Sequence, residues 1–345
     1  MNIYSLDYFE QTLPVDKIRP PYQKPQADGP RLAVCDVKQA GWDGTVPVPS
    51  QEHISLLSPH PAAGSDRAET DHFLQRLGMH TGGGRGFAGV LLDPDCMDPA
   101  PLSAWRRAFD AAPLIVRADR PQQIAALRRE GIPFGLLLDA SGGTLSVRRQ
   151  LATQDLQCVW QSSPVFLLAK GCPDEAEALS RALESWHVLA ADVPGALPGA
   201  LLVRRVTYPK ALSSGGAFPV RLWLQNVGGT PVYPVSRLQL MLRGAKEDCE
   251  IPLRMAARTW PVGDTVYNEI AQLPGLAPGD YQLLCRVWRT DGCGAVPLGK
   301  EAETDGWYPL GQLTLDDMPR PELYHAWDSY YPEGYYPLVD PPLPK

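Results

Sequence analysis

Four aspartates stand where short apolar runs end, and carboxyl groups are well suited to acid–base chemistry. They are Asp36, Asp93, Asp139 and Asp192. Asp93 and Asp139 lie two β-α units apart, and Arg117 stands at the end of the one apolar run between them. A carboxylic acid can donate a proton, a carboxylate can accept one, and a guanidinium group can orient either. Asp93 and Asp139 are therefore candidate catalytic residues.

A repeating pattern between residues 87 and 192 must position these side chains. Stretches with helical periodicity alternate there with apolar runs at 87–93, 113–118, 133–140, 164–171 and 187–192. Such alternation predicts β-α units, and continuous Val, Leu and Ile runs are typical of parallel strands buried on both faces. Sites in α/β sheets and barrels lie at the carboxyl ends of strands, where these aspartates fall.

The α/β pattern begins near residue 31 and ends near residue 195. Apolar runs at 31–37 and 53–59 predict two further strands, and residues 1–30 are expected to form an extended N-terminal arm. The domain at 31–195 is much shorter than the roughly 250 residues of an eight-fold (β/α) barrel. We therefore expect a small or incomplete TIM-like barrel.

One helix of this domain carries clear end signals. Ser65 or Asp66 is its expected N-cap, Glu69 lies in its first turn and Gly78 is its expected end. The glycine-rich stretch at 79–87 then follows a helix and precedes a strand. A phosphate-binding loop needs the opposite order, so we expect a simple connection there.

The hydrophobic pattern of the sequence changes after a linker at 193–200 that is rich in Pro and Gly. Between residues 200 and 315, alternating apolar and polar residues predict an antiparallel, immunoglobulin-like β-sandwich. The C-terminal tail at 316–345 has no core pattern but contains Tyr324, Trp327, Tyr330, Tyr331, Tyr335 and Tyr336. Aromatic residues are enriched at interfaces, so this tail either docks on its own domain or mediates self-association.

The composition narrows the expected partners and location. The net charge of −7 disfavours a nucleic-acid partner. The chain has no apolar run long enough for a transmembrane helix and no secretory signal at its start, so we expect no membrane partner and a cytoplasmic location. The seven cysteines lack CxxC spacing and the six histidines lack HExxH pairing, so neither a metal nor another cofactor is expected.

Several longer sequence segments are distinctive enough to compare with a known family. In the second half they are LQNVGGTPVYP (224–234), APGDYQLLCRVWR (277–289) and DGWYPLGQLTL (305–315). In the first half they are PLIVRA (113–118) and FGLLLDASGGT (134–144). These phrases resemble a bacterial family of uncharacterised proteins in which a glycoside-hydrolase-like barrel precedes a β-sandwich of unknown function. The resemblance covers residues 87–315.

This resemblance implies a carbohydrate ligand. Glycosidic cleavage commonly uses one carboxyl group as general acid and a second as nucleophile or base. Asp93 and Asp139 would fill these roles, with Arg117 and Asp36 binding the substrate. Trp160 would offer a flat apolar face to a sugar ring.

Other roles for the same residues remain open. Asp at a strand end often caps a helix or binds loop amides, Arg117 can pair with Asp93 or Asp139 as a structural bridge, and Trp160 can belong to the core. Barrels of the related family also carry an acidic residue on a later strand, whereas residues 160–171 contain none. We therefore expect a glycan-binding or assembly protein on a degenerate scaffold. The alternative is an active glycoside hydrolase that uses two Asp carboxylates at the barrel rim.

Overall fold

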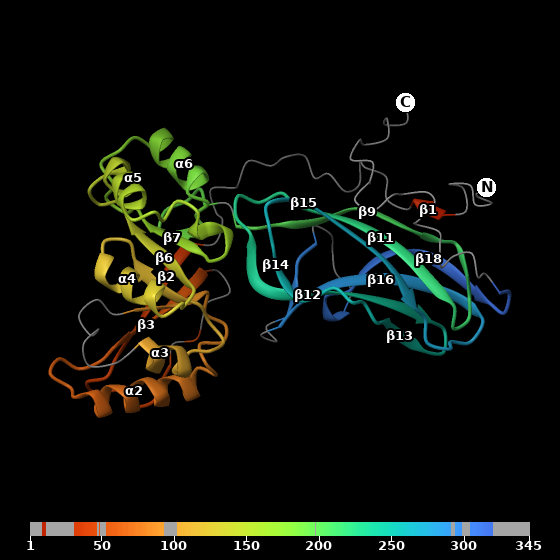
Figure 1. Ribbon diagram of the computed structural model, residues 1–345, viewed down its shortest axis with the longest axis horizontal. Coiled ribbons are helices and arrows are strands. Elements are labelled where there is room, and N and C mark those ends of the chain that lie inside the picture. The colour runs from red at the N-terminus through yellow and green to blue at the C-terminus, as the bar shows by residue number, and fades with distance from the viewer. Residues whose placement is uncertain are drawn as a thin grey trace. The chain divides into compact units, whose positions relative to one another are not determined.

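The computed structural model describes residues 9–11, 31–46, 48, 53–92, 102–196, 198–290, 294–298 and 304–319. The chain divides into two compact units, an α/β unit and a β unit (Figure 1). The α/β unit comprises residues 24–199 together with 229–233, and the β unit comprises 1–23, 200–228 and 234–345. Asp93 and the aromatic residues of the C-terminal tail lie outside the described residues.

A seven-stranded sheet forms the centre of the α/β unit. In chain order its strands are β2 (Arg31–Lys38), β3 (His53–His60), β4 (Gly89–Leu91), β5 (Leu114–Arg117), β6 (Phe134–Asp139), β7 (Val165–Leu168) and β8 (Ala190–Ala191). Each strand pairs in parallel with the next, which confirms the predicted β-α arrangement. Some Cα atoms of β2 and β8 lie within 8 Å of each other, so the sheet curves almost into a barrel.

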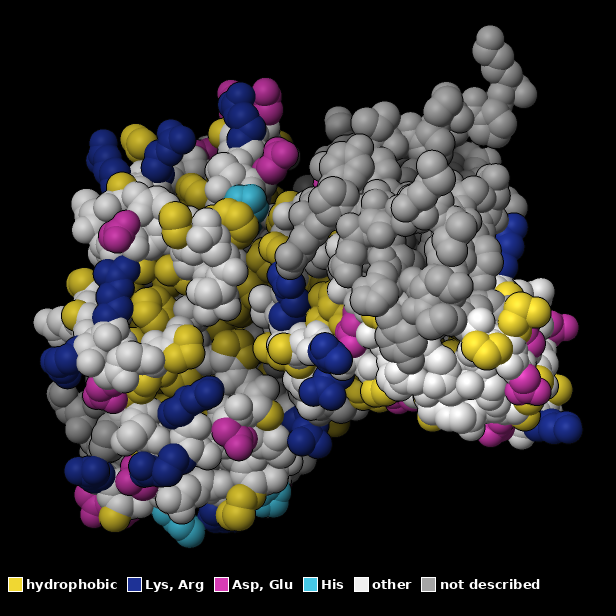
Figure 2. Space-filling model, turned by 45° about the vertical axis from the view of Figure 1, so that its right-hand side comes forward, with side chains coloured by type: hydrophobic (Ala, Val, Ile, Leu, Met, Phe, Trp, Pro, Cys, Tyr) yellow, Lys and Arg dark blue, Asp and Glu magenta, His cyan; other side chains and the backbone are white. Residues whose placement is uncertain are grey.

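Helices alternate with these strands and cover the outer face of the sheet. Within the described residues they are α2 (Arg67–His80), α3 (Leu102–Ala108), α4 (Pro121–Arg129), α5 (Thr144–Thr153) and α6 (Ala176–Ser185). Trp105, Phe109, Leu136 and Leu183 belong to the large apolar core that these layers share. Hydrophobic side chains also reach the surface of this unit, where Figure 2 shows them gathered in a hollow. None of the described helices is both long and apolar enough to cross a membrane.

The inner face of the sheet has a separate and smaller core. Each strand contributes one buried residue to it: Leu32, Leu56, Leu91, Ile115, Leu137, Phe166 and Ala190. The space is narrow, because a Cβ on Gly89 or Gly135 would lie 2.4 or 2.7 Å from the Ile115 side chain. Side chains alternate between the two faces of a strand, so residues two or four positions further on also face inward. This alternation places Asp36, Ser58, His60, Arg117 and Asp139 on the inner face at its carboxyl edge.

Helix α2 begins as its sequence predicts and ends later. The Glu69 backbone N–H donates to Asp66 Oδ1 at 2.9 Å, and the Asp66 N–H donates to Glu69 Oε2 at 3.2 Å, so Asp66 is the N-cap of a capping box. The helix continues to His80, so the expected end at Gly78 is wrong. A Cβ at Gly78 would lie only 2.2 Å from the Ala108 carbonyl oxygen. The glycine therefore allows α2 to approach the end of α3 closely.

The glycine-rich stretch after α2 forms a connection of turns that leads into β4, as predicted. Gly83 and Gly84 adopt φ angles of 76° and 86°, in the left-handed region that glycine tolerates. The segment therefore joins a helix to a strand, which is the order that the sequence predicts.

Two sheets make up the β unit. The first has the order β1 (Phe9–Gln11), β9 (Leu201–Pro209), β11 (Ala217–Asn226) and β15 (Gly263–Gln272). The second has the order β10 (Ala211–Ser213), β18 (Tyr308–Asp316), β16 (Gly279–Arg289), β12 (Val232–Gly244) and β13 (Asp248–Ile251), with β14 (Arg258–Trp260) beside β12 and β17 (Ala295–Val296) beside β16.

Strand pairing in the β unit is mainly antiparallel, as the alternating pattern predicts. This holds for the pairs β1–β9, β9–β11, β11–β15, β12–β13, β12–β16 and β16–β18. Strand β10 differs, because it pairs in parallel with β18. Strand β1 belongs to the predicted N-terminal arm and extends the first sheet beside β9.

Candidate functional site

Arg117 and Asp139 meet at the carboxyl edge of the inner face, at the ends of β5 and β6. Arg117 Nη2 donates to Asp139 Oδ2 at 3.1 Å. The same guanidinium group donates from Nε and Nη2 to both carboxylate oxygens of Asp119, at 3.1 and 3.0 Å. The side chain of Arg117 is 26% exposed, that of Asp139 is 32% exposed and that of Asp119 is 36% exposed. A ligand can therefore reach this network from solvent. One guanidinium group thus holds two carboxylates.

Hydrogen bonding keeps both carboxyl groups ionised. Burial raises the pKa of Asp139, but hydrogen bonds from Ser141 and Arg117 outweigh this effect and place the pKa below its ordinary value. The hydrogen bonds from Arg117 are the main reason that the pKa of Asp119 is also lowered. Asp119 in turn raises the pKa of Arg117. At neutral pH these carboxylates are suited to accept hydrogen bonds or a proton, and unsuited to act as a general acid.

A second polar group lies on the same inner face, at the carboxyl ends of β2 and β3. His60 Nε2 is 2.8 Å from Asp36 Oδ1 and 3.0 Å from Ser58 Oγ. Both contacts use one ring nitrogen, whereas a Ser-His-Asp triad needs a partner on each nitrogen. Asp36 is therefore paired with a histidine on the neighbouring strands β2 and β3, whereas Arg117 and Asp139 lie on β5 and β6.

Trp160 lies at the opposite edge of the sheet. It belongs to the short 3-10 helix η2 (Val159–Gln161), which precedes β7, whereas Asp139 ends β6. All strands of this sheet run in one direction, so the chain enters them at one edge and leaves at the other. The structure thus does not bring Trp160 to the edge that holds Asp139. Its ring stacks instead on His187, with 3.6 Å between the centroids.

Asp192, the last of the strand-end aspartates, accepts hydrogen bonds from backbone N–H groups. Its Oδ1 accepts hydrogen bonds from the N–H groups of Ala169 and Lys170, at 2.6 and 3.1 Å. These contacts tie the loop after β7 to the end of β8, which is the loop-amide role considered from the sequence.

Asp119 and His60 were not predicted from the sequence as site residues. Their closeness to the carboxyl ends of strands could have identified them, because Asp119 stands two residues after β5 and His60 is the last residue of β3. Among the described residues, no three His, Cys, Asp or Glu side chains converge as a metal ion would require.

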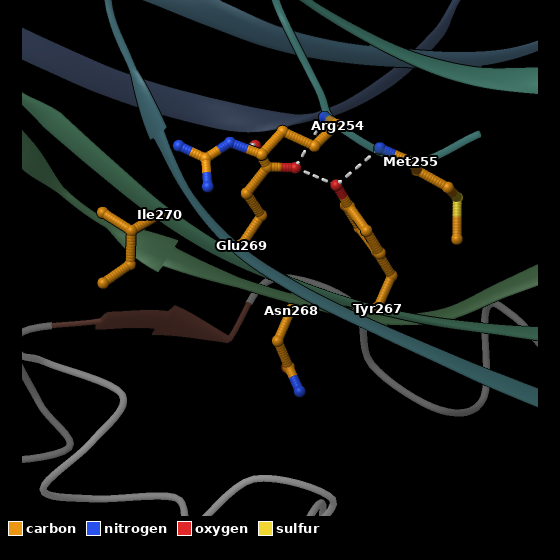
Figure 3. Close-up of a pocket in the computed structure, with 6 residues that line it drawn as sticks. All are labelled: Arg254, Met255, Tyr267, Asn268, Glu269 and Ile270. Carbon is orange, nitrogen blue, oxygen red and sulfur yellow. Dashed lines mark hydrogen bonds and ion pairs between the residues drawn. The ribbon is translucent and has the colours of Figure 1, made fainter.

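The β unit contains a pocket of about 420 Å³ whose polar groups bond to one another (Figure 3). The Tyr267 hydroxyl donates to Glu269 Oε2, and that oxygen also accepts from the Arg254 N–H at 2.9 Å. The Met255 N–H donates to the Tyr267 hydroxyl at 3.2 Å. The Glu269 side chain is only 8% exposed. These contacts fasten the segment after β13 to β15. They also engage the Tyr267 hydroxyl and the Glu269 carboxylate, which a ligand would otherwise contact.

Comparisons with known proteins identify no family. No family model matches the chain, and no curated protein matches its sequence. The CARDB domain of a Pyrococcus furiosus protein is similar to 35% of this chain over 97% of its own length, with 15% identity and a TM-score of 0.24. A mutant β-glucosidase from Listeria innocua in complex with laminaribiose is similar to 85% of this chain, with 11% identity and a TM-score of 0.27.

This chain spans only 46% of the length of that β-glucosidase. The archaellum periplasmic stator protein FlaG from Sulfolobus acidocaldarius is similar to 27% of this chain over 92% of its own length, with 16% identity and a TM-score of 0.19. All three similarities are weak. Function must therefore be inferred from the side chains themselves.

Proposed function

We propose that this protein binds carbohydrate at the inner, carboxyl-edge face of its α/β unit and does not hydrolyse it efficiently. The observation that carries the proposal is the Arg117 guanidinium group held between the ionised Asp119 and Asp139. Carboxylate oxygens accept hydrogen bonds from sugar hydroxyls, and guanidinium N–H groups donate to them. A fixed network with both kinds of group suits a polyhydroxylated ligand. The resemblance of the sequence to glycosidase-like barrels motivates the choice of carbohydrate.

The charge state of the site favours binding over catalysis. A two-carboxylate mechanism needs one carboxyl group that is protonated at the working pH. The lowered pKa values of Asp119 and Asp139 make both of them poor general acids. The alternative function, glycoside hydrolysis, would require Asp93 to donate the proton and Asp139 to act as nucleophile or base.

Turnover and binding assays separate these two functions. We expect binding on an array of oligosaccharides, and no rapid hydrolysis of aryl glycosides or oligosaccharides by the full chain. Removing a general acid or base typically costs about 10²–10⁴-fold in rate. Robust turnover that is abolished by Asp93→Asn or Asp139→Asn would establish the hydrolase and overturn the binding proposal.

We further propose that the near-barrel is a shortened TIM-like barrel and that the β unit is an immunoglobulin-like sandwich. The parallel order of β2 to β8 supports the first assignment, and the two mainly antiparallel sheets support the second. We also propose a cytoplasmic location and self-association through the C-terminal aromatic tail. Light scattering of the full chain and of a chain ending at residue 319 tests the self-association. An unchanged mass after truncation would contradict it.

A further inference from the structure

The α/β unit has a cavity on the face of its sheet opposite the inner-face site. Its volume is about 410 Å³, within the range of roughly 300–1,000 Å³ typical of small-molecule sites. It opens on the outer face of the sheet, where Leu136 and Val165 of β6 and β7 meet Leu151 and Leu156. Two tryptophans, Trp160 and Trp186, complete the apolar lining.

Four side chains of this cavity supply hydrogen-bond donors that no described residue accepts, whereas the Ser185 hydroxyl donates to the Ala182 carbonyl oxygen at 3.3 Å. Arg148 and Gln157 line it and are exposed. Among the described residues, no hydrogen bond or ion pair engages the side chains of Arg148 and Gln157 or the indole N–H groups of Trp160 and Trp186. Arginine and indole can only donate. None of the described residues that line the cavity is a carboxylate, so none of them is a counter-ion for the positive charge of Arg148.

Trp160 is held in place before any ligand binds. One face of its ring stacks on His187, whose Nδ1 donates to the Gly229 carbonyl oxygen at 2.6 Å. The backbone carbonyl of Trp160 accepts a hydrogen bond from the Tyr233 hydroxyl at 2.5 Å. Burial raises the pKa of Tyr233, so this hydroxyl stays a neutral donor. A preorganised aromatic wall lowers the entropic cost of binding a flat ligand.

We propose that this cavity binds a small planar organic anion, an aromatic carboxylate whose ring lies against the tryptophans and whose carboxylate pairs with Arg148. Apolar walls select the ring, and the unpaired guanidinium group selects the acid. The site lies near the amino ends of β6 and β7, so it is independent of the proposed carbohydrate site at the opposite edge.

Calorimetric titration of the full chain tests this proposal, with 2-naphthoate and its neutral analogue 2-naphthamide as probes. We expect 2-naphthoate to bind at least about tenfold more tightly than the amide, as one charge-assisted contact allows. Arg148→Gln should remove this preference. Arg149→Gln is the matched control, because Arg149 is the next exposed arginine of α5 and does not line the cavity.

A tryptophan variant tests the apolar wall separately. Trp186→Leu should weaken 2-naphthoate and 2-naphthamide by similar factors, because both lose the same ring contact. No binding of 2-naphthoate at millimolar concentration would overturn the proposal. Equal affinity for the two probes, or equal effects of Arg148→Gln and Arg149→Gln, would also overturn it.

Discussion

Arg117 is the residue on which the inner-face site depends. It is the cation shared by Asp119 and Asp139, and both carboxylates lie within 3.1 Å of its nitrogens. Without it, the carboxylates of Asp119 and Asp139 would have no shared hydrogen-bond donor between them. Arg117 therefore sets both the charge and the hydrogen-bonding pattern that a ligand meets.

Replacing Arg117 with Met should lower the free energy of unfolding at pH 7 by about 0.5–1 kcal/mol, a small effect because the ion pairs are partly exposed. The pKa values of Asp119 and Asp139 are lowered in the folded state. Their stabilising contribution is therefore complete above the unfolded pKa, about 3.9, and is lost as the pH falls through the folded values. Urea unfolding between pH 7 and pH 3 should show the wild-type advantage shrinking with acid. A pH-independent difference would contradict this explanation, and Arg129→Met is the control.

The sequence predicted part of this site. Asp139 and Arg117 end neighbouring parallel strands, so the β-α pattern predicted that they lie at one edge, with Arg117 beside either Asp93 or Asp139. Asp119 lies two residues beyond the end of β5, so its position marked it as a candidate, but its contact with Arg117 depends on how the chain turns after the strand. Trp160, in contrast, was predicted from the sequence as a site residue but does not lie at the site. Its residue type suits a sugar platform, but a residue type does not reveal which edge of a sheet it occupies.

At the scale of elements, Gly78 shows how helix packing can override a local signal. Glycine often ends a helix, yet α2 continues through Gly78 to His80. The reason is tertiary, because the backbone of α3 lies where a side chain at residue 78 would be. The capping box at Asp66 was predictable, since all its partners lie within one turn of sequence.

Gly78→Ala should destabilise the α/β unit by about 1–3 kcal/mol, because its Cβ would overlap the Ala108 carbonyl and push α2 from α3. Alanine normally favours a helix, so the expected sign is opposite to helix propensity. Met79→Ala is the matched control, since Met79 is 74% exposed on the same helix. Thermal unfolding followed by circular dichroism measures both, and a stabilised Gly78→Ala variant would refute the close approach.

In the β unit, Glu269 fastens the segment after β13 to β15. Glu269→Ala removes the acceptor for Tyr267 and for the Arg254 N–H, and should cost about 1–3 kcal/mol. Hydrogen exchange should also accelerate at the amides of Arg254 and Met255. Asp317→Ala, at an exposed residue, provides the control. Unchanged exchange at these two amides would show that Glu269 does not hold the segment.

At the scale of the whole molecule, the α/β unit is not continuous in sequence. Residues 229–233 belong to it, although they comprise the end of the β11–β12 connection and the first two residues of β12. Gly229 and Tyr233 hydrogen-bond to His187 and to Trp160. Periodicity cannot predict such contacts, because they join positions more than forty residues apart.

Tyr233→Phe should therefore destabilise the α/β unit, although it changes a residue that begins a β-rich stretch. The expected loss is about 1 kcal/mol, since the Trp160 carbonyl loses its hydroxyl donor. Tryptophan fluorescence during urea unfolding provides the measurement. Tyr308→Phe is a matched control, because no described residue bonds to the Tyr308 hydroxyl. Equal effects of the two changes would contradict a specific role for Tyr233.

Titration of wild-type protein and the Arg117→Met variant with an oligosaccharide selected on the array tests the central claim most directly. We predict that the wild type binds without turnover and that Arg117→Met weakens binding about tenfold or more, because charge-assisted hydrogen bonds to the ligand are lost. Arg129→Met, an exposed arginine of α4, should bind like the wild type. Equal affinity of the wild type and Arg117→Met would contradict a carbohydrate site at the inner carboxyl edge.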